Sequence, residues 1–169
     1  MALVTVAVPS CDSSRAARPI ADLIEQLPVA NKQPADTAFE VAEVTLGGIT
    51  KRSIVARDQT RLTSHVTVPK HARFRVSVGV DPRAWSDPGH GVLFLVGVSD
   101  GQVYQTKRSV AVDPFTRAGD RRWHDLDISL EEFAGLTVNI VLNTRRAGEA
   151  GAAADRLSAV WGTPVVIVR

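Results

Sequence analysis

Eight consecutive residues, Arg73–Val80 with the sequence RFRVSVGV, decide the fold class of this chain. Every second position is apolar, and the positions between carry Arg, Ser or Gly. Because successive side chains of a β-strand point to opposite faces of a sheet, this pattern predicts a strand with one face in a core and the other toward water. Leu136–Leu142, LTVNIVL, repeats the alternation. The chain is therefore predicted to be built from half-buried strands.

Strand patterns of the same kind recur along most of the chain. Leu62–Val68 alternates more weakly, and Ser99–Gly101, SDG, predicts a tight hairpin between Val92–Val98 and Gln102–Thr106. The run Gly91–Val98, GVLFLVGV, is apolar at nearly every position and predicts a central strand covered on both faces. Further strands are expected at Phe39–Leu46, Ser53–Ala56, Ser109–Val112, Trp123–Ile128, Leu157–Trp161 and Val165–Val168. Short strands separated by turn signals favour an all-β fold, an antiparallel sandwich or jelly roll.

Helical patterns are confined to two short segments. After Pro19, apolar residues at i, i+3, i+4 and i+7 predict a short amphipathic helix that ends at Pro28. Ser129 and Glu132 have the spacing of a capping box around a single turn. The polar stretch Asn31–Asp36, NKQPAD, separates the first helix from the strands. We therefore expect an N-terminal extension over residues 1–36, with the helix and linker, and a β-sandwich domain over residues 37–169.

The composition is typical of one globular domain of ordinary size. The chain has 169 residues, of which 44% are hydrophobic, and this length buries enough surface to fold without a disulfide or a metal. A formal net charge of +2 argues against a dedicated nucleic-acid-binding protein, and basic pairs such as Lys51-Arg52 are expected at solvated loop ends. No apolar stretch approaches the ~18 residues of a membrane-spanning helix. The apolar start, Ala2–Val8, is either an edge strand or the remnant of an export segment.

Sequence motifs of common enzyme classes are missing. The chain contains no G-x-S-x-G, H-E-x-x-H, G-x-x-x-x-G-K-[ST] or G-x-G-x-x-G. Four aspartates gather around one predicted strand, and two carboxylates about 5–9 Å apart would suffice for glycoside hydrolysis; they are Asp113, Asp120, Asp125 and Asp127. Turn positions and the outer face of a strand explain these aspartates more simply, and their oxygens could also hold a structural calcium ion. A hydrolase is therefore the least favoured class of function.

The three tryptophans fall into two groups. Trp123 and Trp161 begin or end predicted strands and are expected in the core. Trp85 lies in the loop Asp81–Gly91, DPRAWSDPGHG, where prolines and glycines interrupt any strand. It is either an exposed platform for a ligand or a loop residue that folds back over the end of the sandwich.

A glycan site can be assembled around Trp85. Sugar rings stack their apolar faces on flat aromatic side chains, while their hydroxyls need polar partners such as Asp87 and His90 in the same loop. Arg121 and Arg122 could pair bidentately with a uronate or sulfate group, which favours acidic sugars. The sequence therefore predicts a ligand site formed by Trp85, Asp87, His90, Arg121 and Arg122.

The order of these segments resembles a known group of modules. The chain carries PKHA at 69–72, Trp85, DG at 100–101, GDRRW at 119–123 and WGTP at 161–164. From Ile49 to Val168 it is similar to the jelly-roll, galactose-binding-like modules attached to bacterial sulfatases and glycosyltransferases. The resemblance implies a non-catalytic, carbohydrate-binding-like accessory module of a secreted, periplasmic or membrane-anchored protein, with an enzyme domain downstream. It carries over no catalytic residue.

Two functions of different classes follow from this resemblance and from the residues. The first is an extracytoplasmic module with a glycan ligand and a neighbouring enzyme domain as partners. The second is a structural or protein-interaction β-sandwich that packs on a parent protein and has no sugar ligand. No cofactor is expected, although the aspartates could hold a structural calcium ion, and neither nucleic acid nor insertion into a membrane is expected for the chain as given.

Overall fold

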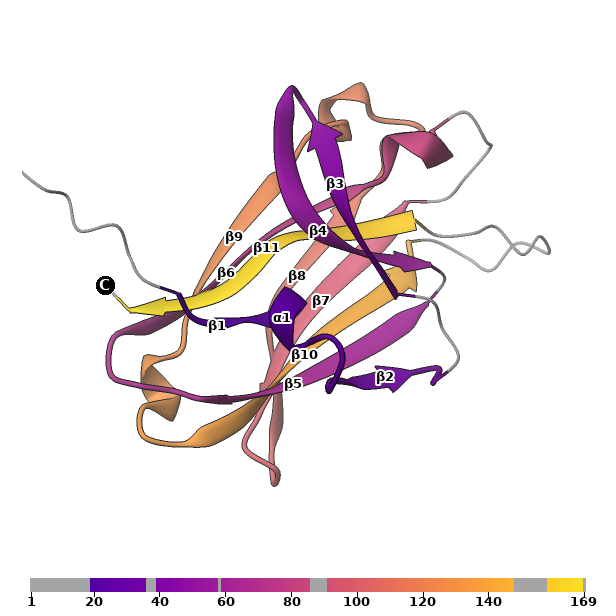
Figure 1. Ribbon diagram of the computed structural model, residues 1–169. Helices are drawn as coiled ribbons and strands as arrows, with labels where there is room; N and C mark the ends of the chain where they lie inside the picture. The colour runs from indigo at the N-terminus through magenta and orange to yellow at the C-terminus, as the bar shows by residue number, and fades with distance from the viewer. Residues whose placement is uncertain (1–18, 36–38, 58, 86–90, 148–157, 169) are drawn as a thin grey trace, which may run out of the picture.

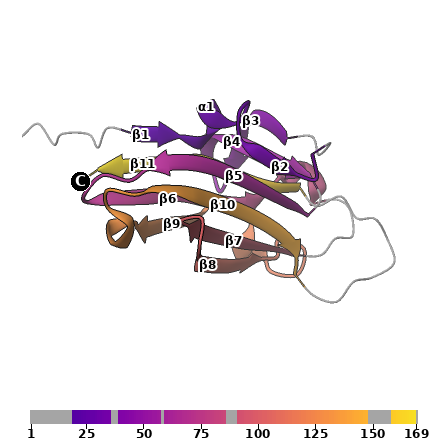
Figure 2. The ribbon, with the colours of Figure 1, turned by 90° about the horizontal axis from the view of Figure 1, so that it is seen from below.

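Two antiparallel sheets pack face to face in the computed structural model, which describes residues 19–35, 39–57, 59–85, 91–147 and 158–168 (Figure 1, Figure 2). Sheet A has the strand order β3-β4-β11-β6-β9, with β1 also paired to β11, and sheet B has the order β2-β5-β10-β7-β8. Sheet A contains β1 (Pro19–Asp22), β3 (Phe39–Leu46), β4 (Ile49–Arg57), β6 (Ala72–Val80), β9 (His124–Ser129) and β11 (Ser158–Val168). Sheet B contains β2 (Asn31–Gln33), β5 (Thr60–Thr67), β7 (Val92–Ser99), β8 (Tyr104–Val112) and β10 (Thr137–Arg146). The predicted all-β, jelly-roll sandwich with a short N-terminal helix is confirmed.

The inner faces of the two sheets form one hydrophobic core. The apolar residues of β6 on which the fold prediction depended are at most 2% exposed; they are Phe74, Val76, Val78 and Val80. At the centre, Phe94 of β7 meets Trp161 of β11 edge to face, with ring centroids 5.0 Å apart and planes at 86°. This pair joins sheet B to sheet A. Leu136, expected to face inward, is 47% exposed because β10 begins one residue later.

The N-terminal segment differs from its prediction. Pro19–Asp22 forms β1, where the first turn of a helix was expected, and only Leu23–Gln26 forms the helix α1. Strand β4 pairs with β11 only as far as Gly162, so β1 supplies the ladder partner for the rest of that edge. The expected polar linker contains β2, which pairs with β5. The segment assigned to an N-terminal extension therefore contributes a strand to each sheet.

Two pairs of predicted strands are single strands in the structure. The segments expected at 102–106 and 109–112 lie largely within β8, and those expected at 157–161 and 165–168 lie largely within β11. In both ladders the pairing register shifts at the interruption, between Val96 and Gly97 opposite β8 and between Gly162 and Val165 in β11. Strand β7 is fully buried on its inner face, whereas Leu93, Leu95 and Ser99 on its other face are only half-buried, so the predicted complete cover on both faces is wrong.

Three single turns of 3₁₀-helix connect strands in the described segments: η1 (Pro82–Ala84), η2 (Ala118–Asp120) and η3 (Glu131–Phe133). The turn expected after Ser129 is η3, but its N-cap is Leu130 without a side-chain cap, so the predicted capping box is wrong. Ser129 Oγ accepts a hydrogen bond from the Glu131 amide at 3.3 Å, whereas Glu132 pairs with Lys107 of β8. The long-range ion pair therefore replaces the local contact.

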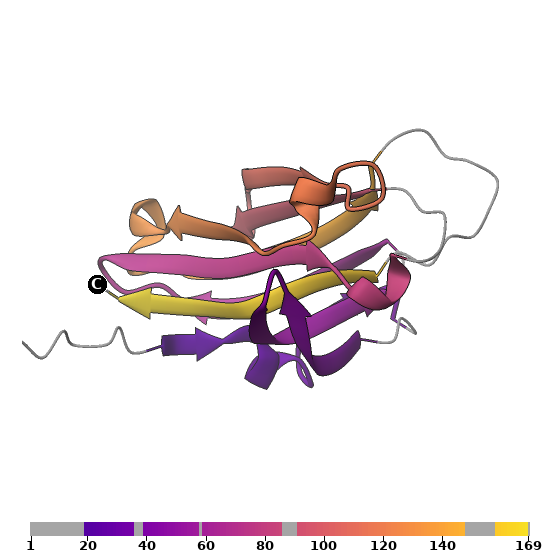
Figure 3. The ribbon, with the colours of Figure 1, turned by 90° about the horizontal axis from the view of Figure 1, so that it is seen from above.

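A second, smaller apolar cluster lies on the outer face of sheet A; it consists of Val44, Leu46, Val55, Trp123 and Val160. Two glycines make room for it. A Cβ atom at Gly79 would lie 2.4 Å from Leu46 Cδ1, and one at Gly162 would lie 3.0 Å from two carbons of the Trp123 ring. The tip of the β3–β4 hairpin, η1 and η2 gather beside this cluster (Figure 3). These segments carry the candidate site.

Candidate functional site

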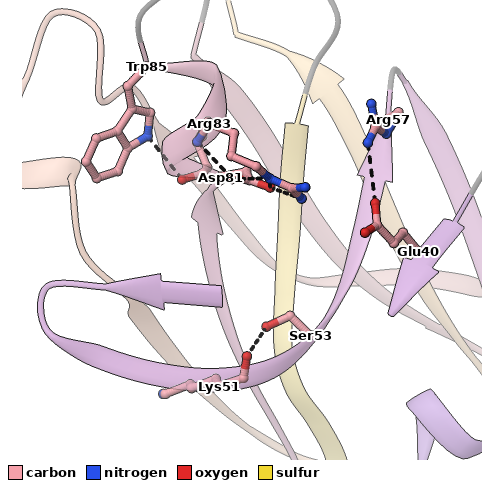
Figure 4. Close-up of polar contacts among 8 residues, drawn as sticks. Glu40, Lys51, Ser53, Arg57, Asp81, Arg83 and Trp85 are labelled. Carbon is pink, nitrogen blue, oxygen red and sulfur yellow. Dashed lines mark hydrogen bonds and ion pairs between the residues drawn. The ribbon is translucent and has the colours of Figure 1, made fainter. Parts of the chain in front are cut away.

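Trp85 follows η1 at the end of β6. The Asp81 carboxylate caps this turn by accepting from the Arg83 amide at 2.9 Å, and it also pairs with the Arg83 guanidinium at 2.6 Å (Figure 4). Trp85 Nε1 donates to the Val80 carbonyl at 3.1 Å, which turns the indole back toward the strand. The half-buried ring packs against both apolar clusters. Trp85 therefore folds back onto the end of β6, in line with the second of the two interpretations of this loop residue, and the residue as a whole is half-buried.

The structure brings Arg121 to Trp85. The guanidinium carbon of Arg121 lies 5.3 Å from the centroid of the Trp85 ring, within the range of a cation–π contact. Its Nε donates to the Pro114 carbonyl at 3.0 Å, which fixes the guanidinium in place. Arg122 is exposed and lies against the β3–β4 turn, where a Cβ at Gly47 would be 3.2 Å from Arg122 Cβ. The other predicted site residues, Asp87 and His90, lie outside the described residues.

A cavity of about 390 Å³ opens on the same outer face of sheet A. Its lining includes Lys51 of β4, Arg75 and Ser77 of β6, Asp125 and Asp127 of β9, and Thr163 of β11. The volume lies near the lower end of the range of about 300–1,000 Å³ that is usual for small-molecule sites. The sequence did not predict this cavity.

Three side chains from three strands meet in the cavity. Ser77 and Asp125 are opposite partners in the β6–β9 ladder, so they share the outer face. Lys51 Nζ donates to Ser77 Oγ at 2.5 Å and to Asp125 Oδ1 at 2.8 Å, and Ser77 Oγ donates to the same carboxylate oxygen at 2.5 Å. The hydrogen bonds from Lys51 and Ser77 hold the pKa of Asp125 below its ordinary value. Asp125 is therefore a carboxylate at neutral pH.

Asp127 lies two residues further along β9 and bridges two arginines. Its Oδ1 accepts from Arg73 Nε at 2.5 Å, and its Oδ2 lies 3.4 Å from Arg75 Nε. The two aspartates on this face are thus each paired with cations.

The other two aspartates of the predicted cluster are turn residues. The Asp113 amide donates to Asp120 Oδ2 at 2.8 Å, and the Asp113 carboxylate accepts from Thr116 and Phe115. Partial burial alone would raise the pKa of Asp113, but these hydrogen bonds outweigh it and the net shift is downward. Asp113 and Asp120 therefore both hold turns together, as predicted.

Lys51 was expected at a solvated loop end and instead lies within β4. Its side chain is only 20% exposed, and its Nζ lies 5.5 Å from the centroid of the Trp123 ring. The signal that could have found it is the alternation of β4, which places Lys51 on the same face as Ser53 and Val55. The adjacent Arg52 made Lys51 part of a basic pair, a pattern that favours a position at the surface.

Within the described segments, no three or more His, Cys, Asp or Glu side chains are grouped so that they could hold a metal ion. That part of the chain therefore contains no such cluster for the structural calcium ion that the sequence allows. No helix of the described segments has the length and apolar character needed to cross a membrane.

Comparisons with known proteins add information about the fold. No protein-family model matches the chain. An uncharacterized protein of Archaeoglobus fulgidus is 29% identical over 82 residues, which are 48% of this chain and 21% of that protein. The chain therefore spans about a fifth of the length of this relative.

Solved structures of carbohydrate-binding modules share the arrangement of strands. The CBM51-2 and INT domains of Clostridium perfringens ZmpB superpose with a TM-score of 0.61 at 15% identity, over 82% of this chain and 29% of that one. The CBM51 of C. perfringens GH95, solved with methyl-galactose, gives a TM-score of 0.58 at 12% identity, over 82% of this chain and 92% of that one. The CBM51-2 of ZmpB with GlcNAc gives 0.54 at 16% identity, over 76% and 25%. The chain thus has the galactose-binding-like β-sandwich fold of these carbohydrate-binding modules.

Proposed function

We propose that this chain is a non-catalytic carbohydrate-binding module and an accessory unit of a larger extracytoplasmic protein, such as a sulfatase or glycosyltransferase. The observation that carries the proposal is the match to the CBM51 of C. perfringens GH95, 92% of which this chain covers. Most of the sandwich therefore shares its fold with a unit that was solved in complex with methyl-galactose.

The proposed glycan contact lies at the end of sheet A that carries Trp85 and Arg121. Trp85 is half-buried and its indole nitrogen is fixed on the Val80 carbonyl, so the orientation of the ring is set before a ligand arrives. Arg121 adds a positive charge 5.3 Å from that ring. An acidic sugar suits this pair, because a guanidinium binds carboxylate or sulfate oxygens bidentately. Asp87, His90 and Arg122 stay proposed members of the site.

The electrostatics of the aspartates support a non-catalytic role. A glycosidase needs a carboxylic acid whose pKa is raised, so that it can donate a proton near neutral pH. The pKa of Asp125 is instead lowered by Lys51 and Ser77, and the net shift of Asp113 is also downward. We expect the purified chain to hydrolyse neither glycosides nor sulfate or phosphate esters. Hydrolysis that Asp125→Asn or Asp127→Asn abolishes would contradict this.

A glycan array followed by calorimetric titration of the best ligand tests the proposal. Removal of a central aromatic contact costs upwards of about 2 kcal/mol, so Trp85→Ala should weaken binding more than tenfold. Tyr104→Ala is the matched control, because it also removes an accessible ring, 41% exposed, but from sheet B. Circular dichroism of both variants checks that they remain folded.

The outcomes separate the two functions. Binding that Trp85→Ala weakens and Tyr104→Ala leaves intact supports the proposed contact. Binding that survives Trp85→Ala moves the contact elsewhere. Failure to bind any glycan would favour a structural or protein-interaction module, an alternative that the fold-back of Trp85 supports because it leaves only part of the ring for a ligand.

A further inference from the structure

We propose that the cavity at Lys51, Ser77 and Asp125 binds one neutral sugar residue through two adjacent hydroxyl groups. The inference rests on the proposed function and adds to it a second contact of different chemistry. It is carried by hydrogen-bonding groups that the cluster leaves available, by the way Lys51 is held, and by the charge of the lining.

The cluster presents one acceptor beside one donor. Both hydrogen bonds from Lys51 and Ser77 go to Oδ1 of Asp125, and Oδ2 accepts none from the part of the chain that the structure describes. The Lys51 ammonium has three protons, of which two are directed at Ser77 and Asp125. Asp125 is 77% exposed, so a ligand can reach it. Two neighbouring sugar hydroxyls match this arrangement, because one can donate to Oδ2 while the other accepts from Nζ.

Lys51 is held in place before any ligand arrives. The Trp123 ring lies below its ammonium group and is itself fixed by the hydrogen bond from Nε1 to the Ile49 carbonyl at 2.8 Å. Gly162 makes this packing feasible, since a Cβ there would lie 3.0 Å from the Trp123 ring and 3.3 Å from Lys51 Cδ. A long side chain that is already ordered loses little further conformational entropy on binding. The cluster is therefore preorganised.

Strand β11 has an irregular backbone where it borders the cavity. Strand β11 shifts register between Gly162 and Val165, and Thr163 has a φ of 44°, a left-handed conformation that a β-branched residue rarely adopts. Bulges and strained residues of this kind are common beside functional sites, where they redirect side chains. Here the bulge places the exposed Thr163 on the wall of the cavity.

The charges of the lining favour an uncharged ligand. Lys51 is paired with Asp125, and Arg75 lies against Asp127, so the positive charge of each cation is offset by a neighbouring carboxylate. The volume of about 390 Å³ suits a single ring rather than a chain of sugars. Binding in this cavity should therefore depend little on salt, whereas an acidic sugar at Arg121 should bind more weakly as ionic strength rises.

Titrations followed by amide chemical shifts in NMR spectra test the inference. The probes are methyl galactoside and N-acetylglucosamine, with glucuronate as the acidic probe. A neutral probe should give saturable shifts at the amides of Ser77, Asp125 and Thr163 that persist from ~50 to ~300 mM NaCl. Asp125→Asn and Lys51→Met should each weaken this binding about tenfold. Arg52→Met is the matched control, because Arg52 adjoins Lys51 in β4 but pairs with Glu25.

The results distinguish this inference from the proposed function. Shifts that centre on Trp85 and Arg121 with any probe, and none at the cavity, would overturn the cavity site and leave the proposed function intact. Equal effects of Asp125→Asn and Arg52→Met would also overturn it. No shift with any probe, together with no ligand on the glycan array, would overturn both.

Discussion

Removal of the Phe94 ring should lower the free energy of unfolding more than any truncation on the outer faces of the two sheets. Phe94 is 1% exposed and meets Trp161, also 1% exposed, at a centroid distance of 5.0 Å. Because Phe94 belongs to sheet B and Trp161 to sheet A, their contact spans the core. Phe94→Ala would leave a cavity at this point with rigid strands on both sides.

The expected loss of stability can be worked from this geometry. A Phe→Ala change in a core costs about 3–5 kcal/mol, and an edge-to-face aromatic pair contributes about 0.5–1.5 kcal/mol beyond its buried area. We therefore expect a loss of about 4 kcal/mol, the middle of the range for such a change. For a domain of this length each kcal/mol lowers Tm by about 2–4 °C, so the Tm should fall by about 8–16 °C.

Urea and thermal unfolding followed by far-UV circular dichroism measure this loss. Leu136→Ala is the control, because Leu136 is 47% exposed and its truncation should change stability by no more than about 0.5 kcal/mol. If Phe94→Ala costs no more than Leu136→Ala, the two rings do not join the sheets and the core has been wrongly assigned.

Three further predictions concern the inward face, the carboxylate cluster and the N-terminal segment. Val78→Asp places a carboxylate at a position that is 0% exposed and should cost several kcal/mol; unfolding at the same urea concentration as the parent chain would show that Val78 does not face the core. The pKa of Asp125 is lowered in the folded chain, so its contribution to stability is fully present above the unfolded value of about 3.9 and is lost as pH falls through the folded value. The small difference in urea midpoint between the parent and Asp125→Asn should thus stay constant from about pH 7 to pH 5 and shrink below about pH 4; a difference that grows with acidity would contradict the assigned hydrogen bonds. A chain that begins at Thr37 lacks β1, β2 and the buried Leu23 and Ile24, and we expect its Tm to fall well below that of the full chain; an unchanged Tm would support the predicted boundary at residue 36.

The inward face of the sandwich could be predicted because alternation is a local property. Along β6 every second residue is apolar, and no distant contact is needed to choose its face. The N-terminal segment was predicted only in part: the helical spacing of Ile20, Leu23, Ile24 and Leu27 covers about two turns, and only Leu23–Gln26 is helical, while Pro19–Asp22 is a strand. What decided its conformation was the open edge of β11 beyond Gly162, which lies more than a hundred residues away in the sequence.

The candidate site shows the same division between local and distant signals. The loop chemistry around Trp85 indicated a ligand platform, and the turn containing Arg121 does meet that residue. The cavity at Asp125 depends on the register of β6 against β9 and on the bulge in β11, neither of which is visible in one sequence. The basic pair Lys51-Arg52 predicted a position at the surface, whereas Lys51 packs on Trp123 and lines a cavity.

The pairing of β1 with β11 has a mechanical consequence. Pro19 and Ile167 are register partners, so the two ends of the described chain lie side by side. A force that pulls these ends apart would open the β1–β11 ladder like a zipper, breaking its few hydrogen bonds one after another. Strand β11 would stay clamped on its other edge by the long ladder with β6. Under load, β1 would therefore detach first while the remainder of sheet A keeps its shape.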